Sequence, residues 1–167
     1  QYIRYNGSTS STTVVQFGVP RGSVLGPLFF ILYTVDVFHI AEELGFFIHG
    51  YADDLQLYDH CLARDTAQLS IRLAHCIEVM GQWMSSNRLK LNASKTEFIW
   101  LGSTRRLAGC TFDPIIISGV PIQPSSTVRD LGAYIDSGMS FTDHVTRLTR
   151  TGFFHIRQLR SIRRSLT

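Results

Sequence analysis

Two adjacent carboxylates, Asp53 and Asp54, are the strongest chemical signal in the sequence. They lie between an apolar run at 46–48 and alternating residues at 55–58, a pattern that predicts two short strands joined by a polar turn. A tight turn can present both side chains together, and because like charges repel, the pair favours a cation between them. Mg²⁺ suits this position, since it takes hard oxygen ligands and leaves coordination sites for phosphate. The pair therefore indicates metal-assisted phosphoryl transfer, although aspartate is also frequent in turns for structural reasons alone.

Three helices are predicted from the spacing of the apolar residues. The first follows Ser23, which can cap it, accepts Pro27 in its first turn and ends at Gly45. Because this helix is apolar on most sides, we expect it to be buried. The second helix covers 65–88, where apolar residues recur at three- and four-residue steps. The third covers 141–162 and has a similar apolar stripe.

The remaining strands are predicted from β-branched and aromatic residues between turn signals. They lie at 2–5, 12–15, 95–101, 115–117 and 128–135. The first two should form a hairpin around the polar turn at 6–10. The order of the elements predicts an α+β fold, with helices packed on an antiparallel sheet.

Charge is unevenly distributed along the chain. All 13 acidic residues lie at or before Asp143, whereas six of the 16 basic residues are arginines from Arg147 onward. A basic C-terminal segment is typical of proteins that bind a polyanion, and nucleic acid is the first candidate. A solvated basic helix face is the alternative interpretation.

The cysteines and the apolar stretches exclude several other classes of protein. Three cysteines without close spacing predict neither a disulfide framework nor a zinc site. The longest apolar stretch, 24–40, contains Asp36 and His39, so we do not expect it to span a membrane. A reducing, intracellular setting is the default expectation.

Four motifs occur in one order: Gly-Val-Pro-Arg-Gly-Ser-Val-Leu-Gly-Pro-Leu at 18–28, Tyr-Ala-Asp-Asp at 51–54, Asn-Arg-Leu-Lys-Leu-Asn at 87–92 with Ser-Lys-Thr-Glu-Phe at 94–98, and Val-Arg-Asp-Leu-Gly-Ala-Tyr-Ile-Asp at 128–136. Together they resemble the reverse transcriptases of LINE-type (non-LTR) retrotransposons, in particular those of the Jockey and CR1 types. Several ordered motifs are far more specific than one. The resemblance implies a partial polymerase palm over residues 1–138 and a thumb-like basic helix over residues 139–167.

The resemblance also implies roles for individual residues of an RNA-directed DNA polymerase, whose partners are an RNA template, a DNA primer and deoxynucleoside triphosphates. Asp53 and Asp54 would bind two Mg²⁺ or Mn²⁺ ions, and Lys95 would assist the departure of pyrophosphate. Contacts with the template and the nucleotide are implied for Gly18, Pro20, Arg21, Gly22, Tyr51 and Ala52. Contacts with the primer are implied for Leu131 and Gly132. Contacts with backbone phosphates are implied for Arg147, Arg150, Arg157, Arg160, Arg163 and Arg164. From residue type alone, Arg21, Tyr51 and Lys95 also fit ordinary packing or surface positions.

The family places its fingers and its first catalytic aspartate before the hairpin at which this sequence starts. We therefore expect the N-terminal part of the same polyprotein to be missing, and the 167 residues alone to have little polymerase activity. By analogy with the family, the location would be the nucleus and cytoplasm. Two alternatives stay open: a catalytically dead, truncated retroelement remnant that at most binds nucleic acid, and a reverse transcriptase of the group II intron or telomerase type.

Overall fold

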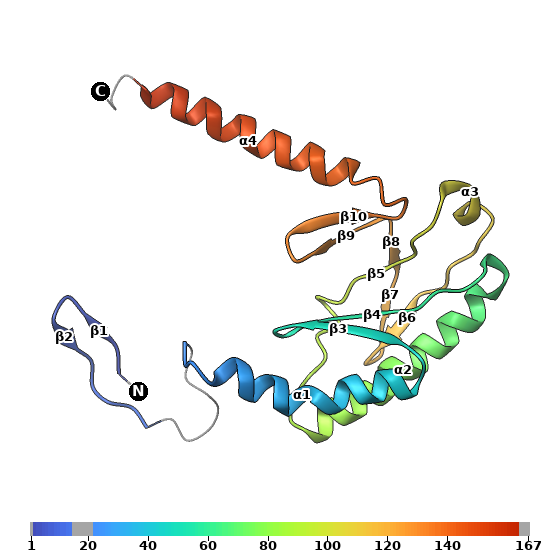
Figure 1. The fold of residues 1–167 in the computed structure, drawn as a ribbon, viewed down its shortest axis with the longest axis horizontal. Coiled ribbons are helices and arrows are strands. Elements are labelled where there is room, and N and C mark those ends of the chain that lie inside the picture. The colour runs from blue at the N-terminus through green and yellow to red at the C-terminus, as the bar shows by residue number, and fades with distance from the viewer. Residues whose placement is uncertain (1, 15–21, 164–167) are drawn as a thin grey trace. The chain divides into compact units, whose positions relative to one another are not determined.

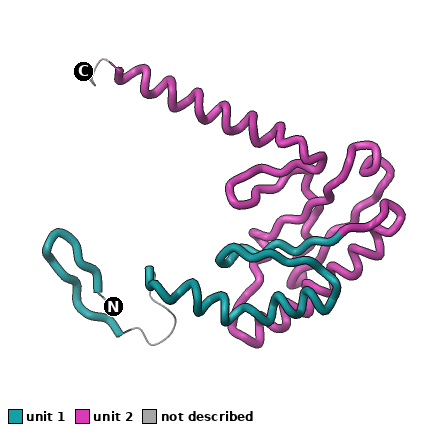
Figure 2. Tube along the Cα trace, viewed as in Figure 1, with its two compact units in different colours: residues 1–59 teal, residues 60–167 magenta. Residues whose placement is uncertain are grey.

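The computed structural model describes residues 2–14 and 22–163. The chain forms two compact units, residues 1–59 and residues 60–167 (Figure 2). The first unit contains the Asp53-Asp54 turn, and the second contains the basic C-terminal helix. Within the described ranges, no helix is both long enough and apolar enough to cross a membrane.

Over its described residues, the first unit consists of two hairpins and one helix (Figure 1). Its elements are β1 (Arg4–Tyr5), β2 (Ser8–Thr9), α1 (Gly26–Glu43), β3 (Phe47–Tyr51) and β4 (Asp54–Tyr58). The N-terminal hairpin is shorter than predicted, because its second strand is Ser8–Thr9 and the strand expected at 12–15 is not formed over the described residues 12–14. Asn6 and Gly7 both have positive φ, so the chain reverses in two residues.

Helix α1 follows Leu25, and the prediction that Ser23 caps it is wrong. Ser23 Oγ has no hydrogen-bond partner among the residues that the structure describes. Pro27 occupies the first turn as predicted, and Gly45, at φ 79°, ends the helix. The expected burial is also wrong for most of the helix, since only Thr34, Val37 and Ala41 are buried. The narrow β3–β4 hairpin covers one face of α1, which leaves several large apolar side chains exposed: Leu28, Phe29, Ile31, Leu32, Tyr33 and Val35.

The second unit has two long helices and a series of short strands. Its elements are η1 (Ala63–Asp65), α2 (Thr66–Ser86), β5 (Phe98–Ile99), α3 (Thr104–Leu107), β6 (Ile115–Ile117), β7 (Val120–Ile122), β8 (Pro124–Ser125), β9 (Thr127–Asp130), β10 (Ala133–Asp136) and α4 (Thr142–Ile162). The predicted second and third helices are confirmed, as is the strand at 115–117. Three of the short elements, α3, β7 and β8, were not predicted, because so few residues carry no clear periodicity.

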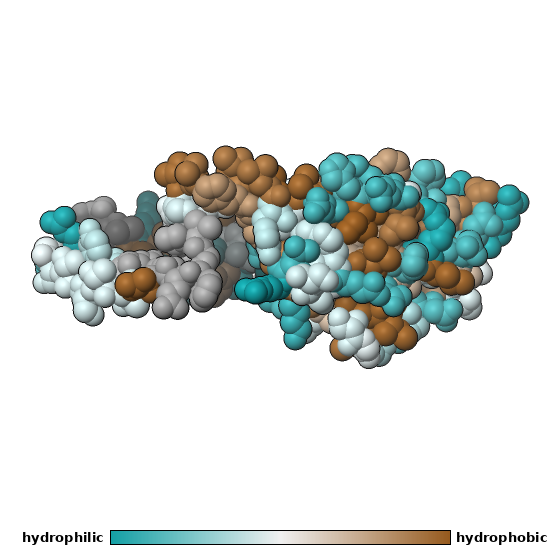
Figure 3. Space-filling model, turned by 90° about the horizontal axis from the view of Figure 1, so that it is seen from below, coloured by the Kyte–Doolittle hydropathy of each residue, from teal (hydrophilic) through white to brown (hydrophobic). Residues whose placement is uncertain are grey.

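The core of the second unit lies between α2 and β6. The residues of α2 that are buried follow the predicted amphipathic spacing, and Ile115 and Ile117 of β6 are buried as well. Cys76 is fully buried, and its Sγ lies 3.8 Å from Met80 Sδ. Burial raises the pKa of Cys76 to about 11, and the nearby Arg72 opposes that rise. Apolar side chains also remain at the surface of the chain, as Figure 3 shows.

The strands pair in twos instead of forming one antiparallel sheet. The described residues contain four antiparallel pairs and one parallel pair, β5 with β8. Mixed helices and strands confirm the α+β class, but the single sheet is not observed. Two strand predictions need correction: the strand at 95–101 is reduced to β5, and the strand at 128–135 is the hairpin β9–β10. That hairpin turns at Leu131 and Gly132, whose φ values of 44° and 90° exclude a continuous strand.

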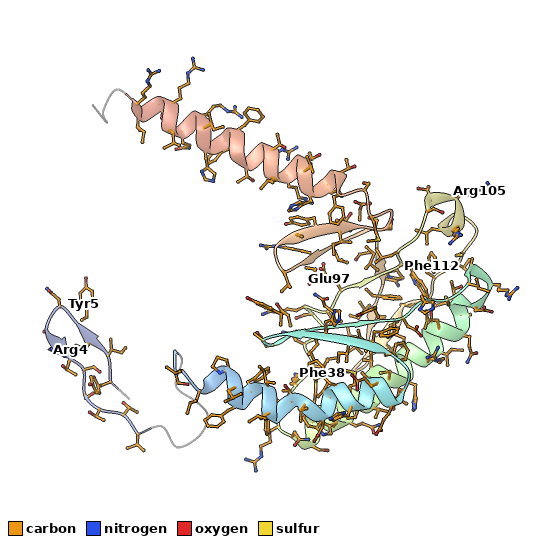
Figure 4. All side chains as sticks on the ribbon, viewed as in Figure 1. Arg4, Tyr5, Phe38, Glu97, Arg105 and Phe112 are labelled. Carbon is orange, nitrogen blue, oxygen red and sulfur yellow. The ribbon has the colours of Figure 1, made fainter. Side chains whose placement is uncertain are left out.

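The packing of α1 on β3 leads to a test of stability. A Cβ atom at Gly50 would lie 2.6 Å from Phe38 Cζ and 3.3 Å from Leu55 Cδ2 (Phe38 is labelled in Figure 4). Gly50→Ala should therefore lower the free energy of unfolding by about 1–3 kcal/mol through overpacking. Urea unfolding followed by circular dichroism measures the change.

Gly81 provides the matched control, because it lies inside α2 and a Cβ atom there would meet open space. Gly81→Ala should raise stability by about 0.5–1 kcal/mol. In a Phe38→Leu background, Gly50→Ala should cost less than in the wild type. Equal losses in both backgrounds would contradict the steric explanation.

Candidate active site

The Asp53-Asp54 pair lies at the tip of the hairpin β3–β4, as the sequence predicts. Tyr51 and Asp54 form the last cross-strand pair, so Ala52 and Asp53 alone make the turn. Ala52 has φ 56°, the left-handed value that a two-residue turn requires. Both carboxylates are exposed. The turn thus presents Asp53 at its tip and Asp54 at the first position of β4.

One face of this hairpin packs against helix α1 of the same unit. Phe46 is 3% exposed, and Ile48 is buried where β3 contacts α1. Because side chains alternate along a strand, Phe47, His49 and Tyr51 lie on the opposite face. The hairpin is therefore anchored along one side and open along the other.

The open face carries an aromatic cluster that the sequence analysis missed. The Phe47 and Tyr58 rings stack with centroids 5.5 Å apart, and Tyr58 Oη lies 3.1 Å from His49 Nε2. Tyr51 is on the same face and is 68% exposed. Period-two alternation at 47, 49 and 51 was the signal that could have revealed this face.

The carboxylate pair supplies only part of a metal-binding set. Across residues 2–14 and 22–163, no group of three or more His, Cys, Asp or Glu residues could hold a metal ion. Two carboxylates still fit Mg²⁺, which commonly uses one or two protein carboxylates together with water and substrate phosphates. The donor set is thus suited to an ion held jointly with a phosphate-bearing ligand.

Lys95 belongs to the second unit and lies in a turn instead of the predicted strand. Asn92 forms this turn: its Oδ1 accepts a hydrogen bond from Ser94 N at 3.2 Å, and its backbone oxygen accepts one from Lys95 N at 3.0 Å. A side chain that bonds to the backbone two residues ahead competes with strand formation. The Lys95 side chain is exposed.

The first motif is only partly described by the structure. Gly18, Pro20 and Arg21 lie outside the described residues, as does Arg164 at the other end of the chain. Gly22 is described, is exposed and has φ 80°. Only Gly22 of the four predicted residues in this motif therefore has a defined place, four residues before α1 begins.

Helix α4 leaves its arginine side chains exposed. Within the helix these are Arg147, Arg150, Arg157 and Arg160, and Arg163, directly after the helix, is exposed as well. The apolar stripe of the same helix is exposed too, with Leu148 at 64% and Ile156 at 59%. Arg147 Cζ lies 4.4 Å from the centroid of the Tyr134 ring, which joins α4 to the β9–β10 hairpin that carries Leu131 and Gly132.

A hydrogen-bonded loop fixes where α4 begins. Asp136 Oδ1 accepts hydrogen bonds from Gly138 N and Ser140 N at 3.1 and 3.0 Å. These donors, the Ser140 backbone first among them, hold the pKa of Asp136 below its usual value. Ser140 Oγ in turn accepts a hydrogen bond from Thr142 N, at the first residue of α4. The start of α4 is therefore tied to the end of β10.

Comparisons with known proteins agree with the family that the motifs resemble. The family described as reverse transcriptase (RNA-dependent DNA polymerase) matches residues 1–135. The chain is 30% identical over 164 residues to the probable RNA-directed DNA polymerase from transposon BS of Drosophila melanogaster, a match covering 95% of this chain and 18% of that protein. The probable RNA-directed DNA polymerase from transposon X-element of the same organism is 29% identical, over 86% of this chain and 15% of that protein.

The RNA-directed DNA polymerase from the mobile element jockey of Drosophila funebris is 25% identical, over 87% of this chain and 16% of that protein. The chain thus spans less than a fifth of the length of these curated relatives. No solved structure matches it.

The backbone of the Asp53 turn gives a direct test of its conformation. A left-handed φ costs a non-glycine residue about 1–2 kcal/mol, and replacement by glycine removes this cost. Glycine also has more conformational freedom in the unfolded state, which cancels part of the gain in stability. Ala52→Gly should therefore raise the free energy of unfolding by about 0.5–1 kcal/mol. Ala74→Gly, inside α2, is the control and should lower it by about 1 kcal/mol. A loss of stability in Ala52→Gly, measured by urea unfolding, would show that the turn has another conformation.

Proposed function

Because the chain belongs to the reverse transcriptase (RNA-dependent DNA polymerase) family, we propose that it contributes to RNA-directed DNA synthesis by a non-LTR mobile element. In this reaction the 3′ hydroxyl of a DNA primer attacks the α-phosphorus of a deoxynucleoside triphosphate opposite an RNA template, and pyrophosphate leaves. The order of the motifs and the names of the relatives support this assignment. The substrates are proposals, since the chain spans a small part of each relative.

The exposed carboxylates at the tip of β3–β4 carry the proposal. Asp53 and Asp54 would hold divalent cations, Mg²⁺ or Mn²⁺, together with the phosphates of the substrate. Such ions stabilise the attacking and leaving oxygens of an in-line phosphoryl displacement. The chain's own part is to fix the two carboxylates through the short turn and to keep them accessible.

The other residues fall into two groups of supporting roles. In the first unit, Tyr51 and Ala52 adjoin the carboxylates and would face the template–primer. In the second unit, Leu131 and Gly132 would approach the primer end, and Lys95 would protonate or neutralise the departing pyrophosphate. We assign residues 1–138 to a polymerase palm and residues 139–167 to a thumb. The boundary falls in the Asp136–Ser140 loop that leads into α4.

Manganese binding tests the role of the carboxylates. Mn²⁺ titrated into the chain with a primer–template duplex, and followed by electron paramagnetic resonance, should show a site that depends on Asp53. Replacing a residue that only orients a metal ligand lowers metal affinity by roughly 10–100-fold. Asp53 would bind the ion directly, so Asp53→Asn should weaken Mn²⁺ binding by roughly tenfold or more.

Asp113→Asn is the matched control, because Asp113 is also exposed but lies in the second unit. This variant should bind Mn²⁺ as the wild type does. If Asp53→Asn and Asp113→Asn behaved alike, the carboxylate turn would not be the metal site.

The exposed basic face of α4 supports nucleic-acid binding, with or without catalysis. Arg150, Arg157 and Arg160 are exposed, and contacts from such residues to phosphates are independent of sequence and sensitive to salt. In the triple variant R150Q/R157Q/R160Q, the slope of log affinity against log salt concentration should fall by about 3 for an RNA–DNA duplex. Fluorescence anisotropy at several salt concentrations measures this slope.

The control R105Q/R106Q removes two exposed arginines from α3 (Arg105 is labelled in Figure 4). Its slope should stay close to that of the wild type. A similar loss per arginine in both variants would mean that general positive charge, and not the face of α4, governs binding.

A further inference from the structure

Two arginines from different elements converge on one tyrosine ring beside the start of α4. Arg129 and Tyr134 are cross-strand partners in the β9–β10 hairpin, and Arg129 Cζ lies 5.9 Å from the ring centroid. Arg147, one turn into α4, places its Cζ 4.4 Å from the same centroid. We propose that Arg129 and Arg147, held on Tyr134, form a clamp for the phosphodiester backbone of nucleic acid. The clamp deepens the proposed function, on which it rests.

Both guanidinium groups lie over the Tyr134 ring, and Arg147 is the closer of the two. An arginine over an aromatic face uses the plane of its guanidinium, while the N–H groups at the edge remain free to pair with phosphate. Both arginines are exposed, and neither forms an ion pair with a carboxylate over residues 2–14 and 22–163. A planar guanidinium that lacks an internal anion is well suited to bidentate binding of phosphate oxygens.

The carboxylates around the clamp have other partners. Glu97 Oε2 accepts a hydrogen bond from the backbone N of Arg129 at 2.9 Å, which fixes the strand instead of the guanidinium (Glu97 is labelled in Figure 4). Asp143 Oδ2 accepts a hydrogen bond from Thr127 Oγ1 at 2.9 Å. Because these acids lie close by, net charge alone would not attract a phosphate here. The geometry of the two arginines must supply the affinity.

That geometry is built in advance by contacts between α4 and the hairpin. Tyr134 N donates a hydrogen bond to His144 Nδ1 at 3.3 Å, and Thr127 Oγ1 bonds to Asp143. The first turn of α4 is thus joined to both strands of the hairpin. Arg147 follows within one turn, so these contacts fix its backbone position relative to Arg129, which lowers the entropy lost on binding.

The clamp is continuous with the basic face of α4. Arg150 lies three residues after Arg147, and residues at this spacing are neighbours on a helix surface. A backbone phosphate bound between Arg129 and Arg147 would therefore be followed by further phosphates along Arg150 and Arg157. This arrangement fits a polymer of phosphodiesters better than a single phosphate group.

Duplex binding by single variants tests the clamp. The chain, with Arg129→Gln or Arg147→Gln, is titrated against a fluorescent RNA–DNA duplex at several salt concentrations. Each variant should bind roughly threefold to tenfold more weakly, and its salt slope should fall by about 1. The control Arg105→Gln removes an exposed arginine from α3 and should bind as the wild type does.

A double-mutant cycle separates an organised clamp from simple charge loss. Tyr134→Leu removes the ring without changing charge and should weaken binding. In that background Arg147→Gln should cost clearly less than in the wild type. Tyr134→Phe keeps the ring and should bind normally, which guards against an effect of misfolding. Independent effects of Tyr134→Leu and Arg147→Gln would overturn the proposal.

The remaining outcomes distinguish this inference from the proposed function. If the wild type binds duplex but Arg129→Gln and Arg147→Gln match Arg105→Gln, the clamp is wrong and the proposed function stands. If the wild type does not bind duplex, both fail. If Arg147→Gln weakens binding of a fluorescent deoxynucleoside triphosphate but not of duplex, the site takes a triphosphate, and the assignment to the backbone is overturned.

Discussion

The two-residue turn between β3 and β4 is the constraint on which the candidate active site depends. With Tyr51 and Asp54 paired across the ladder, only Ala52 and Asp53 remain to reverse the chain. A longer loop would let the two residues move independently, whereas this turn fixes the backbone positions from which both carboxylates extend. The left-handed φ of Ala52 is its structural cost. Phe46 and Ile48 are buried before the turn and anchor the hairpin that carries it.

A second fixed junction organises the basic end of the chain. The β9–β10 hairpin also reverses in two residues, Leu131 and Gly132, and its strands contact the first turn of α4. No residue of α4 is buried, so the direction of the helix is determined at its start, where it contacts the hairpin. The Asp136–Ser140 hydrogen bonds and the Tyr134–Arg147 contact supply this control. They allow an exposed helix to present arginines in a defined direction.

The elements that sequence predicted well are those with a long or repeated signal. The periodicity of 65–88 gave α2, and the apolar runs around Asp53-Asp54 gave the β3–β4 hairpin. The failures have local causes. The strand predicted at Lys95 is a turn, because the Asn92 side chain accepts a hydrogen bond from the backbone there. The strand predicted over 128–135 is two strands, because the backbone turns at Leu131 with positive φ. Burial of α1 could not be judged from composition, since an apolar helix is buried only where a neighbour covers it.

The two units differ in charge, and this difference fits the phosphoryl transfer that we propose. Residues 1–59 contain six acidic and two basic residues, whereas residues 60–167 contain seven acidic and 14 basic ones. Carboxylates at the Asp53 turn attract cations, and arginines on α4 attract anions. The divalent cation that we propose for the turn matches the charge of the first, and the nucleic acid that we propose for α4 matches the charge of the second. A small neutral ligand would match the charge of neither unit.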